Sequence, residues 1–365
     1  WPSGAQSDGT DIRFSKADGT HLYYERERWD NSGQQAEFWV LVDTVWGNNS
    51  GTHTSDSTEI RIWWGDTSAG DSSKPAKVFD SAYGFAGVWH FAPADTFGDA
   101  LGANDLTNYS SVPLTSGGII GHARTFNDGE RIEKATVTNI LKPDSFTVSG
   151  WLKSGISGTG IDEYICAQGD NIGLYVNRMV DDDVDFYYKK VGGGWEDVIS
   201  GDVNSTDNNW RLITGTFSDH SNILKAFVDG DSVKAQTANV SVVYDAGNEF
   251  TIGSMKSSRY ITGNIDEVRM ESVPRSNDWI RLCYQNQRSD DALVDYPPYA
   301  PVTENYATRW DSSRTIYLNT SPATGAKVAN DVVDFPVLIR LSAATGTWPG
   351  DGQQDHVRFS AADEI

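Results

Sequence analysis

Carboxylates are the side chains of this sequence whose spacing comes closest to a catalytic arrangement. Retaining glycoside hydrolysis needs two carboxyl groups about 5 Å apart, and one face of a strand presents such groups at positions i and i+2 or i+4. The nearest string runs from Asp266 to Glu271. On a regular strand Asp266 and Glu267 face opposite sides, and Asp266 and Glu271 diverge as well because they are an odd number of residues apart. We therefore predict no catalytic residues and a non-enzymatic protein.

Metal and nucleophile chemistry find little support in the sequence. The six histidines are scattered and are never paired at the spacing of metal ligands. We interpret His90 as a packed side chain. The two cysteines, Cys166 and Cys283, fit no zinc motif, and they are either joined in a disulfide or are two buried thiols.

Aromatic side chains in loops are the candidates for ligand binding. A sugar site needs an exposed aromatic ring with polar groups nearby. Trp195 follows three glycines, and Trp46 and Tyr260 also lie in predicted loops. These three residues are our candidate ligand-binding residues, and packing inside the protein is the alternative for each. Most of the 13 tryptophans are expected in cores, since alternation along strands turns Trp39, Trp63 or Trp64, and Trp151 inward.

The chain is strongly acidic, with a formal net charge of −22 over 365 residues. Nucleic-acid binding needs clustered Lys and Arg, so this charge excludes nucleic acid as a partner. The acidic residues indicate a solvated surface, bound cations or a salty medium. No apolar run is long enough to span a bilayer. Asn-x-Ser/Thr sequons, which are glycosylation acceptors in exported proteins, begin at Asn48, Asn108, Asn204, Asn239 and Asn319. We predict an extracellular or cell-surface location.

Strand patterns dominate the chain and predict an all-β fold. Short alternating runs recur between Gly, Asn, Asp and Ser clusters, as in a sandwich or barrel. The clearest runs are Glu37–Val42, Glu59–Trp64, Phe146–Leu152, Val184–Lys190, Arg211–Phe217, Ile223–Gly230, Gly263–Met270, Arg314–Thr320 and Asp334–Ser342. One short helix is expected within Pro274–Gln287, where Ser276 can cap the first turn. The acidic, Pro-rich stretch Arg288–Asn305 is predicted to be a linker or an extended strap.

The two ends of the chain carry the same residues in the same order. Trp1 and Pro2 recur as Trp348 and Pro349 at an offset of 347, and Arg13-Phe14-Ser15 recurs as Arg358-Phe359-Ser360 at an offset of 345. Ala17 and Asp18 recur at the second offset as Ala362 and Asp363. A repeat this long indicates a tandem array of domains rather than a solenoid.

The segment from about Gly84 to Gln287 resembles a laminin-G-like domain of the concanavalin A-like lectin/glucanase superfamily. The resemblance depends on GVWHF (Gly87–Phe91), FTVSGWLK (Phe146–Lys153), AFVDG (Ala226–Gly230) and, most specifically, GNIDEVRMESVPRSNDWIRLCYQNQ (Gly263–Gln287). It implies an antiparallel jelly-roll β-sandwich. Laminarinase-type enzymes of this superfamily carry Glu-x-Asp-x-(x)-Glu on a concave strand, a pattern that this chain lacks.

The same resemblance implies a structural calcium ion. Related sandwiches hold calcium with an Asp at the position of Asp266, with backbone oxygens of the first strand and with a Gly-containing turn, which matches Asn127-Asp128-Gly129 here. Asp266 and Asp128 are therefore candidate metal ligands. The alternative is that Asp266 only accepts hydrogen bonds from backbone amides.

The remaining segments resemble parts of a domain of unknown function that accompanies such modules in large bacterial and archaeal surface proteins. Residues 306–365, with SRTIYLNT and DFPVLIRLS, resemble its N-terminal part, and residues 1–83 resemble its C-terminal part. We therefore expect domains at 1–83, 84–287 and 306–365, with the linker at 288–305. The split domain is expected to be a second β-sandwich.

Two functions follow as expectations. The first is a structural and adhesive repeat unit of a large extracellular or cell-surface protein, in which head-to-tail completion of the split domain builds filaments. The second is a carbohydrate-binding, lectin-like module. The expected partners are neighbouring copies of the same repeat, joined covalently or by strand donation, and glycans.

Overall fold

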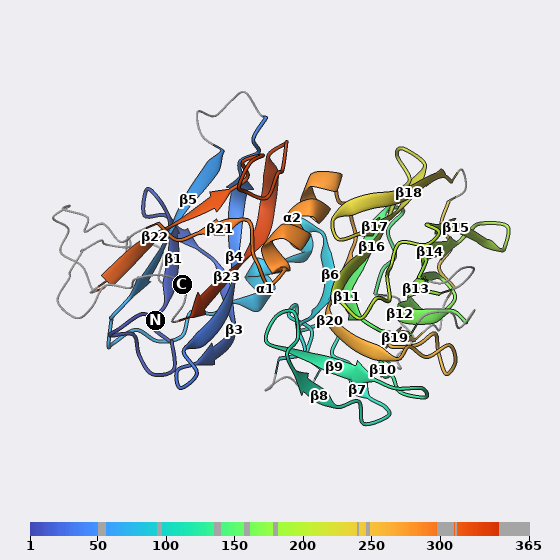
Figure 1. The fold of residues 1–365 in the computed structure, drawn as a ribbon, viewed down its shortest axis with the longest axis horizontal. Coiled ribbons are helices and arrows are strands. Elements are labelled where there is room, and N and C mark those ends of the chain that lie inside the picture. Colours follow the sequence, from blue (N-terminus) through green and yellow to red (C-terminus); the bar gives the residue numbers. More distant parts are fainter. Residues whose placement is uncertain are drawn as a thin grey trace. The chain divides into compact units, whose positions relative to one another are not determined.

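The computed structural model describes residues 1–49, 56–92, 97–134, 140–156, 161–177, 182–238, 241–245, 249–297, 310 and 312–342. The chain divides into two compact units (Figure 1). Unit 1 comprises Trp1–Val78 and Gln285–Ile365, and unit 2 comprises Phe79–Tyr284. Strands predominate in both units and every sheet is antiparallel, as the all-β prediction requires.

Unit 1 contains two antiparallel sheets. The five-stranded sheet has the order β2 (His21–Leu22), β1 (Arg13–Lys16), β5 (Ser57–Trp64), β22 (Ser312–Asn319) and β21 (Val294–Asp295). The three-stranded sheet has the order β23 (Val332–Ser342), β4 (Gln35–Val45) and β3 (Tyr24–Asp30). Each sheet therefore combines strands from both ends of the chain.

The two ends of the chain build one core in unit 1. β22 pairs with β5 from Ser312↔Trp64 to Asn319↔Ser57, and β23 pairs with β4 from Val332↔Val45 to Ser342↔Gln35. The buried side chains of these four strands come from both halves: Phe38, Val40, Ile60, Ile62, Ile316, Leu318, Phe335, Val337 and Ile339. The two segments that resemble parts of a split domain thus complete each other here. The predicted linker Arg288–Asn305 contributes β21, and its residues 298–305 lie outside the described part of the chain.

The outer edge of β23 is closed by side chains rather than by another strand. The amide of Asn286 accepts from Leu338 N at 2.7 Å and donates to Leu338 O at 2.9 Å, as a paired strand would. Tyr296 donates its hydroxyl to Arg340 O at 2.6 Å. Pro336 has no amide hydrogen to offer at this edge. These features suppress the open-edge pairing to which a bare edge strand is prone.

Unit 2 is a sandwich of a seven-stranded and an eight-stranded sheet. The first has the order β15 (Trp195–Ile199), β14 (Val184–Lys189), β13 (Ile172–Val176), β12 (Glu163–Gln168), β19 (Phe250–Ile252), β10 (Ile132–Lys134) and β7 (Thr107–Asn108). The second has the order β18 (Asp231–Thr237), β17 (Ile223–Val228), β16 (Arg211–Ser218), β11 (Phe146–Lys153), β20 (Gly263–Glu271), β9 (His122–Phe126) and β8 (Leu114–Ser116), with β6 (Phe85–Trp89) also paired to β20.

The core of unit 2 lies between these two sheets. Phe146, Val148 and Val268 enter it from the eight-stranded sheet, and Leu174 and Phe186 enter it from the seven-stranded sheet. Gly215 of β16 lies against the Phe186 ring, and a Cβ at this position would come within 2.1 Å of that ring. Because cores are packed as densely as crystals, this glycine is a requirement of the close approach between the sheets.

Helices are few and short. They are α1 (Pro75–Val78), the 3₁₀ turn η1 (Ser81–Tyr83) and α2 (Asn277–Gln287). The Ser276 hydroxyl accepts from Trp279 N at 3.1 Å, so the predicted cap of α2 is confirmed. Each of the nine predicted strand runs overlaps a strand of the structure. Trp39 and Trp151 are buried, as predicted, and Trp63 and Trp64 are both buried although alternation predicted only one of them inside.

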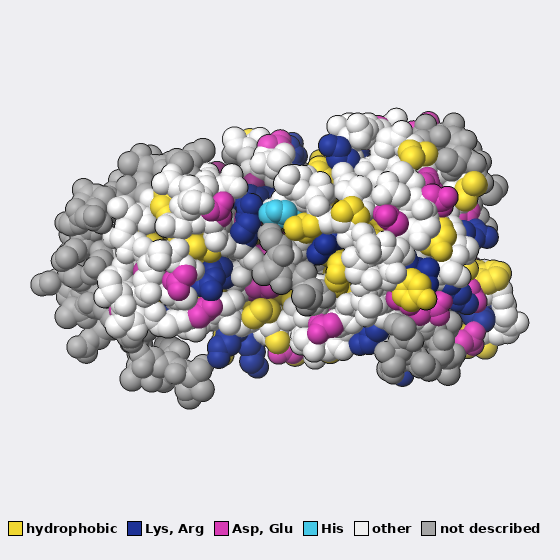
Figure 2. Space-filling view, turned by 90° about the horizontal axis from the view of Figure 1, so that it is seen from below, with side chains coloured by type: hydrophobic (Ala, Val, Ile, Leu, Met, Phe, Trp, Pro, Cys, Tyr) yellow, Lys and Arg dark blue, Asp and Glu magenta, His cyan; other side chains and the backbone are white. Residues whose placement is uncertain are grey.

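The surface is charged but mixed in sign. On the face drawn in Figure 2, Asp and Glu side chains are dispersed among Lys and Arg.

Among the described helices, none combines the length and the apolar character needed to cross a membrane.

Candidate ligand-binding face of unit 2

Tyrosines cover part of the outer face of the seven-stranded sheet. Along β14, Phe186 points into the sandwich core, and its neighbour Tyr187 points away from it, as strand alternation requires. Tyr164 of β12 and Tyr175 of β13 lie on the same outer side and join Tyr187 in one cluster. We call Tyr164, Tyr175, Tyr187 and Trp195 the aromatic face.

The rings of the aromatic face are in mutual contact. Tyr164 and Tyr175 stack with centroids 4.5 Å apart and an interplanar angle of 15°. Tyr187 meets Tyr175 edge-on at 5.9 Å, and Trp195 meets Tyr187 edge-on at 6.5 Å. Offset stacking and edge-on contacts are the favourable aromatic geometries. The cluster therefore holds its rings in fixed orientations.

Two features lock the tyrosines in place. Tyr175 donates its hydroxyl to Asp185 Oδ2 at 2.7 Å. Gly173 lies beneath two rings, where a Cβ would come within 2.3 Å of Tyr187 and 2.8 Å of Tyr164. Burial raises the pKa of Tyr164 above its usual value, because the ionised phenolate would be taken out of water.

Trp195 is the accessible member of the aromatic face. Its side chain is 55% exposed, whereas the three tyrosines are almost fully buried. The indole Nε1 donates to Asp170 O at 3.0 Å, which fixes the ring orientation. Asp170 also pairs through Oδ2 with Lys256 Nζ at 3.0 Å, and both of these side chains are partly exposed. An exposed, oriented indole thus lies close to a carboxylate and an ammonium group.

Neither of the other two candidate aromatic residues belongs to the aromatic face. Tyr260 belongs to unit 2, and its hydroxyl is 3.5 Å from Arg131 Nη1, beside β10. The neighbouring residue Arg259 accepts through its carbonyl from Tyr164 N of β12 at 3.4 Å, and β12 and β15 are three strand spacings apart, or roughly 14 Å. Trp46 belongs to unit 1 and is half-buried, with its backbone bonded to Thr58 and Thr320. Trp195 and Tyr260 therefore lie at different positions along the seven-stranded sheet of unit 2.

Tyr109 is an exposed aromatic residue that the sequence did not point to. Tyr109 is 62% exposed, and the Arg131 guanidinium lies 4.0 Å from its ring centroid. In the sequence, Tyr109 is the middle residue of the sequon that begins at Asn108. Its exposure depends on the pairing of β7 with β10, which is not a local property of the sequence.

The two candidate calcium ligands are separated in unit 2. Asp266 is fully buried, and its carboxylate accepts from Ile120 N at 3.1 Å and from Glu267 N at 2.9 Å. Asp128 lies on an exposed turn. In the β9–β20 register Phe126 lies opposite Gly263, so that Asp128 lies beyond that end of β20, away from Asp266. Asp266 matches the alternative in which its carboxylate binds backbone amides.

We expect calcium to have little effect on unit 2 because the Asp266 carboxylate already has amide donors. Adding calcium or EDTA should shift the midpoint of thermal unfolding by less than about 2 °C, a change worth under about 1 kcal/mol in a domain of this size. Differential scanning calorimetry in the two buffers checks this. A calcium-dependent rise of several degrees would contradict it.

A β-bulge changes the geometry of the carboxylates in β20. The β11–β20 register shifts between Ser149 and Trp151, and Glu267 has a φ of 50°. Ile265, Val268 and Met270 enter the core, so that two residues, Asp266 and Glu267, separate the core residues Ile265 and Val268 where regular alternation allows only one. The prediction that Asp266 and Glu267 face opposite sides of a regular strand is therefore wrong, because a bulge breaks the alternation.

The β20 carboxylates are engaged with neighbouring groups. Glu267 Oε1 is 2.7 Å from His90 Nδ1, and Arg269 Nη2 donates to Glu267 Oε2 at 2.9 Å. Burial alone would raise the pKa of Glu267, but His90 and Arg269 together hold it below its usual value. Arg275 donates to Glu271 Oε1 at 2.7 Å. His90 is buried in unit 2, in agreement with its interpretation as a packed side chain.

The cysteines and sequons have these environments. Cys166 is buried, Cys283 is half-buried, and both are free thiols. Burial raises the pKa of each thiol to about 12, which makes both poor nucleophiles.

The asparagines of the five sequons lie in different environments. Asn204 is exposed, and Asn239 lies outside the described residues. The side-chain amides of the other three sequon residues donate hydrogen bonds: Asn48 to Thr320 O, Asn108 to Val112 O and Asn319 to Asp295 Oδ2.

Comparison with solved structures finds similarity at low sequence identity. The binding domain of Paraclostridial Mosquitocidal Protein 1 has a TM-score of 0.46 and 13% identity, over 58% of this chain and 57% of that one. The botulinum neurotoxin serotype D binding domain has a TM-score of 0.43 and 15% identity, over 58% and 54%. This chain thus spans little more than half of either domain. Domain 4 of AbnA, a GH43 extracellular arabinanase from Geobacillus stearothermophilus in complex with arabinotriose, has a TM-score of 0.44 and 17% identity, over 54% and 96%.

Family models match two parts of the chain. A search of curated proteins found no match. Residues 8–91 match a domain of unknown function, DUF2341, and residues 124–281 match the concanavalin A-like lectin/glucanases superfamily. The chain therefore carries a concanavalin A-like domain within unit 2, together with a DUF2341 match at its N-terminal end.

Proposed function

We propose that unit 2 is a non-enzymatic, glycan-binding module of an extracellular or cell-surface protein. The observation that carries this proposal is Trp195, an exposed indole on the outer face of the seven-stranded sheet. The apolar faces of sugar rings pack on such indoles, and nearby polar groups select among hydroxyl arrangements.

The surroundings of Trp195 support this role. Tyr187 supports the indole edge-on, and the bond from Nε1 to Asp170 O holds the ring in one orientation. A ring that is already oriented loses little conformational entropy when a ligand stacks on it. The Lys256–Asp170 pair provides a donor and an acceptor for hydroxyl groups. Gly192 and Gly193, in the turn just before Trp195, have no atoms within 4 Å of an added Cβ, which leaves room for a ligand.

The absence of catalysis is part of the proposal. Asp266, Glu267 and Glu271, the carboxylates closest to a glycosidase pattern, are bonded to backbone amides, to His90 and to arginines. A catalytic pair instead needs one carboxylate and one carboxylic acid facing the scissile bond. An extracellular location accords with a glycan partner, because most polysaccharides and protein-linked glycans are displayed outside cells.

We expect Trp195→Ala to weaken glycan binding about tenfold, because stacking on one aromatic ring is worth about 1 kcal/mol beyond the area it buries. A glycan array with the intact chain identifies the ligand, and titration calorimetry of the variant measures the loss. Tyr109→Ala is the matched control, since it removes an equally exposed ring at the opposite end of the same sheet. Unchanged affinity in Trp195→Ala, or the same loss in both variants, would refute the assignment.

We also propose that the chain is a structural, adhesive repeat unit, with copies joined head to tail into a filament. What supports this second role is the recurrence of Trp1-Pro2 and Arg13-Phe14-Ser15 as Trp348-Pro349 and Arg358-Phe359-Ser360, because in the structure the strands from the two ends of one chain already complete unit 1. Electron microscopy of the purified chain tests it. Fibres are expected, and a uniform monomer at every concentration would contradict this role.

A further inference from the structure

Residues 1–18 fill a specific seat in unit 1. Their strand β1 lies between β2 and β5, with Phe14 opposite Leu22 on one side and Ile62 on the other. We call the surface that these residues cover the first-strand seat. Its walls are β2, β5, the loop 65–73 and the side chains of Tyr24, Trp29 and Phe38.

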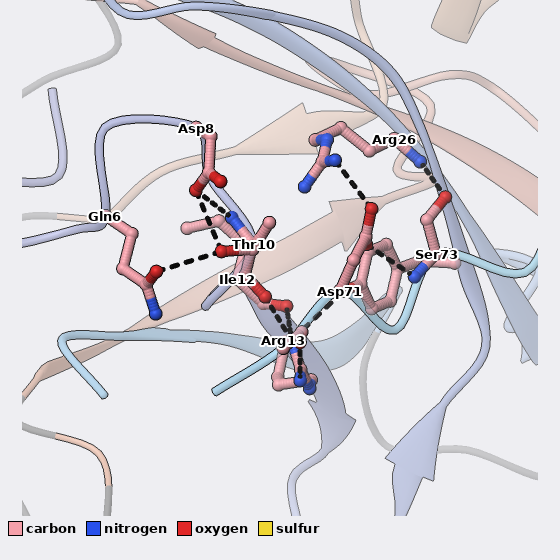
Figure 3. Close-up of polar contacts among 10 residues, drawn as sticks. Gln6, Asp8, Thr10, Ile12, Arg13, Arg26, Asp71 and Ser73 are labelled. Carbon is pink, nitrogen blue, oxygen red and sulfur yellow. Dashed lines mark hydrogen bonds and ion pairs between the residues drawn. The ribbon is translucent and has the colours of Figure 1, made fainter. Parts of the chain in front are cut away.

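Arg13 anchors this segment through its guanidinium. Nη1 donates to Thr10 O at 2.9 Å, to Ile12 O at 2.7 Å and to Tyr24 Oη at 3.2 Å, and Nη2 donates to Gly70 O at 2.6 Å (Figure 3). The guanidinium also lies 5.1 Å from the ring centroid of Trp310. The seat thus binds a buried arginine through carbonyl oxygens, a hydroxyl and an aromatic face.

The neighbouring residues anchor the segment through apolar and hydroxyl contacts. Phe14 is fully buried and meets Tyr24 at 5.5 Å and Phe38 at 5.4 Å. Ser15 Oγ accepts from Trp63 Nε1 at 2.9 Å. At the start of the chain, the ring of Trp1 lies 4.6 Å from that of Trp29, and Pro2 is buried.

The residues that recur near the C-terminal end are the anchors of this seat. Trp348-Pro349 repeats Trp1-Pro2, and Arg358-Phe359-Ser360 repeats Arg13-Phe14-Ser15. At the offset of Trp348, Gln353 also repeats Gln6, whose amide donates to Asp66 O at 2.8 Å and to Ala69 O at 2.9 Å. A segment with the same anchors in the same order has the chemistry to occupy the same seat.

We propose that residues 348–363 of one copy of the chain dock in the first-strand seat of a second copy. In the structure, residues 1–18 of the same chain occupy the first-strand seat. Each chain therefore carries two segments, residues 1–18 and residues 348–363, with the anchor residues for this one surface. Residues 348–363 follow β23 after only five residues. When β22 and β23 of one copy pair with β5 and β4 of another, they bring residues 348–363 to the seat of that copy.

When β22 and β23 move from their own chain to a second copy, the contacts that hold unit 1 together can be kept. β22 and β23 can make the same pairs between copies as within a chain, which is the low-cost route to association that strand exchange offers. The identity of the partner is thus a second copy of this chain. This inference rests on the repeat role proposed above and is independent of glycan binding by unit 2.

Cysteine cross-linking between two full-length variants tests the proposal. Ser15 lies opposite Arg61 in the β1–β5 pair, a separation that suits a disulfide. By the repeat, Ser360 takes the place of Ser15. Variants Arg61→Cys and Ser360→Cys are unfolded together, refolded together and oxidised. We expect disulfide-linked dimers on a non-reducing gel, beyond the background of either variant alone.

Three controls make the outcome decisive. Ser15→Cys with Arg61→Cys in one chain checks that the geometry supports a disulfide. Adding Phe359→Ala to the Ser360→Cys chain should abolish the mixed dimer, because it removes the ring that corresponds to the buried Phe14. No mixed dimer, or a cross-link only when Arg61→Cys and Ser360→Cys are in the same chain, would overturn docking between copies. Glycan binding is measured separately, so either proposal can fail alone.

Discussion

We expect Ile339→Asp to unfold unit 1 while unit 2 stays folded. Ile339 lies on β23 opposite Phe38 of β4 and is fully buried. A carboxylate at this position is taken out of water with no partner, which costs at least about 5 kcal/mol and approaches the whole stability of a small domain. Limited proteolysis followed by mass spectrometry should show new cleavage within residues 1–78 and 285–342, but protection of 79–284.

Val333→Asp is the matched control on the same strand. Val333 is 57% exposed, so a carboxylate there stays hydrated and should change stability by less than about 0.5 kcal/mol. Equal protease resistance in Ile339→Asp and Val333→Asp would contradict the role of β23 in the core of unit 1. Cleavage throughout 79–284 would contradict the independence of unit 2.

We expect Glu267→Leu to destabilise unit 2 by about 3–5 kcal/mol, which is roughly a 10 °C drop in its unfolding midpoint. Arg269 is almost completely buried, and the substitution removes the carboxylate to which its guanidinium donates. His90 loses the same partner. Differential scanning calorimetry measures the change.

The double variant Glu267→Leu/Arg269→Met distinguishes two causes of the lost stability. One is the loss of the ion pair, and the other is the cost of keeping the Arg269 charge buried without the Glu267 carboxylate. Replacing both charged groups with apolar side chains of similar size is often nearly neutral. We therefore expect the double variant to recover most of the lost stability. A double variant as unstable as Glu267→Leu would show that the loss of the pair itself, and not the buried arginine that has lost this carboxylate, carries the effect.

The strands were predictable from the sequence because their signals are local. Runs such as Phe146–Leu152 and Asp334–Ser342 alternate or are continuously apolar between turn residues, and both lie in strands of the structure. The capped helix before Gln287 is likewise local, since Ser276 and Trp279 are three residues apart. The fold class could be read from such segments alone.

The bulge at Glu267 could not be predicted in this way. Whether a strand is regular depends on its partners, here on β11, where Gly150 lies between the two shifted pairs. No proline or glycine lies between Ile265 and Met270 to mark the irregularity, and Gly263 is three residues before Asp266. The prediction that Asp266 and Glu267 face opposite sides assumed regular alternation along the strand, and it failed because the bulge lies at these two residues.

The candidate site was predicted in part. Trp195 was selected because it follows three glycines, and it is the exposed indole of the aromatic face. Tyr187, Asp170 and Lys256, which surround it, come from β14 and from two loops separated along the chain. Their proximity depends on strand pairing across the sheet, which a single sequence does not specify.

The sequence showed that the two ends of the chain carry a repeat, but it did not show that strands from the two ends pair with each other. The recurrence of Trp-Pro and Arg-Phe-Ser indicated a split domain. That β23 pairs with β4 over ten residue pairs within one chain required the structure. The contacts of Arg13 and Phe14 explain in physical terms why those residues are the repeated ones.

Indole resonances of the ¹⁵N-labelled chain, recorded while a glycan selected on the array is added, test the central claim most directly. The chain has 13 tryptophans, and Trp195 combines high exposure with a place on the aromatic face. We predict that the Nε1–H resonance of Trp195, assigned by its absence in Trp195→Ala, shifts in a saturable way while those of the buried Trp151 and Trp89 do not. Saturable binding that leaves the Trp195 resonance unmoved would contradict the account.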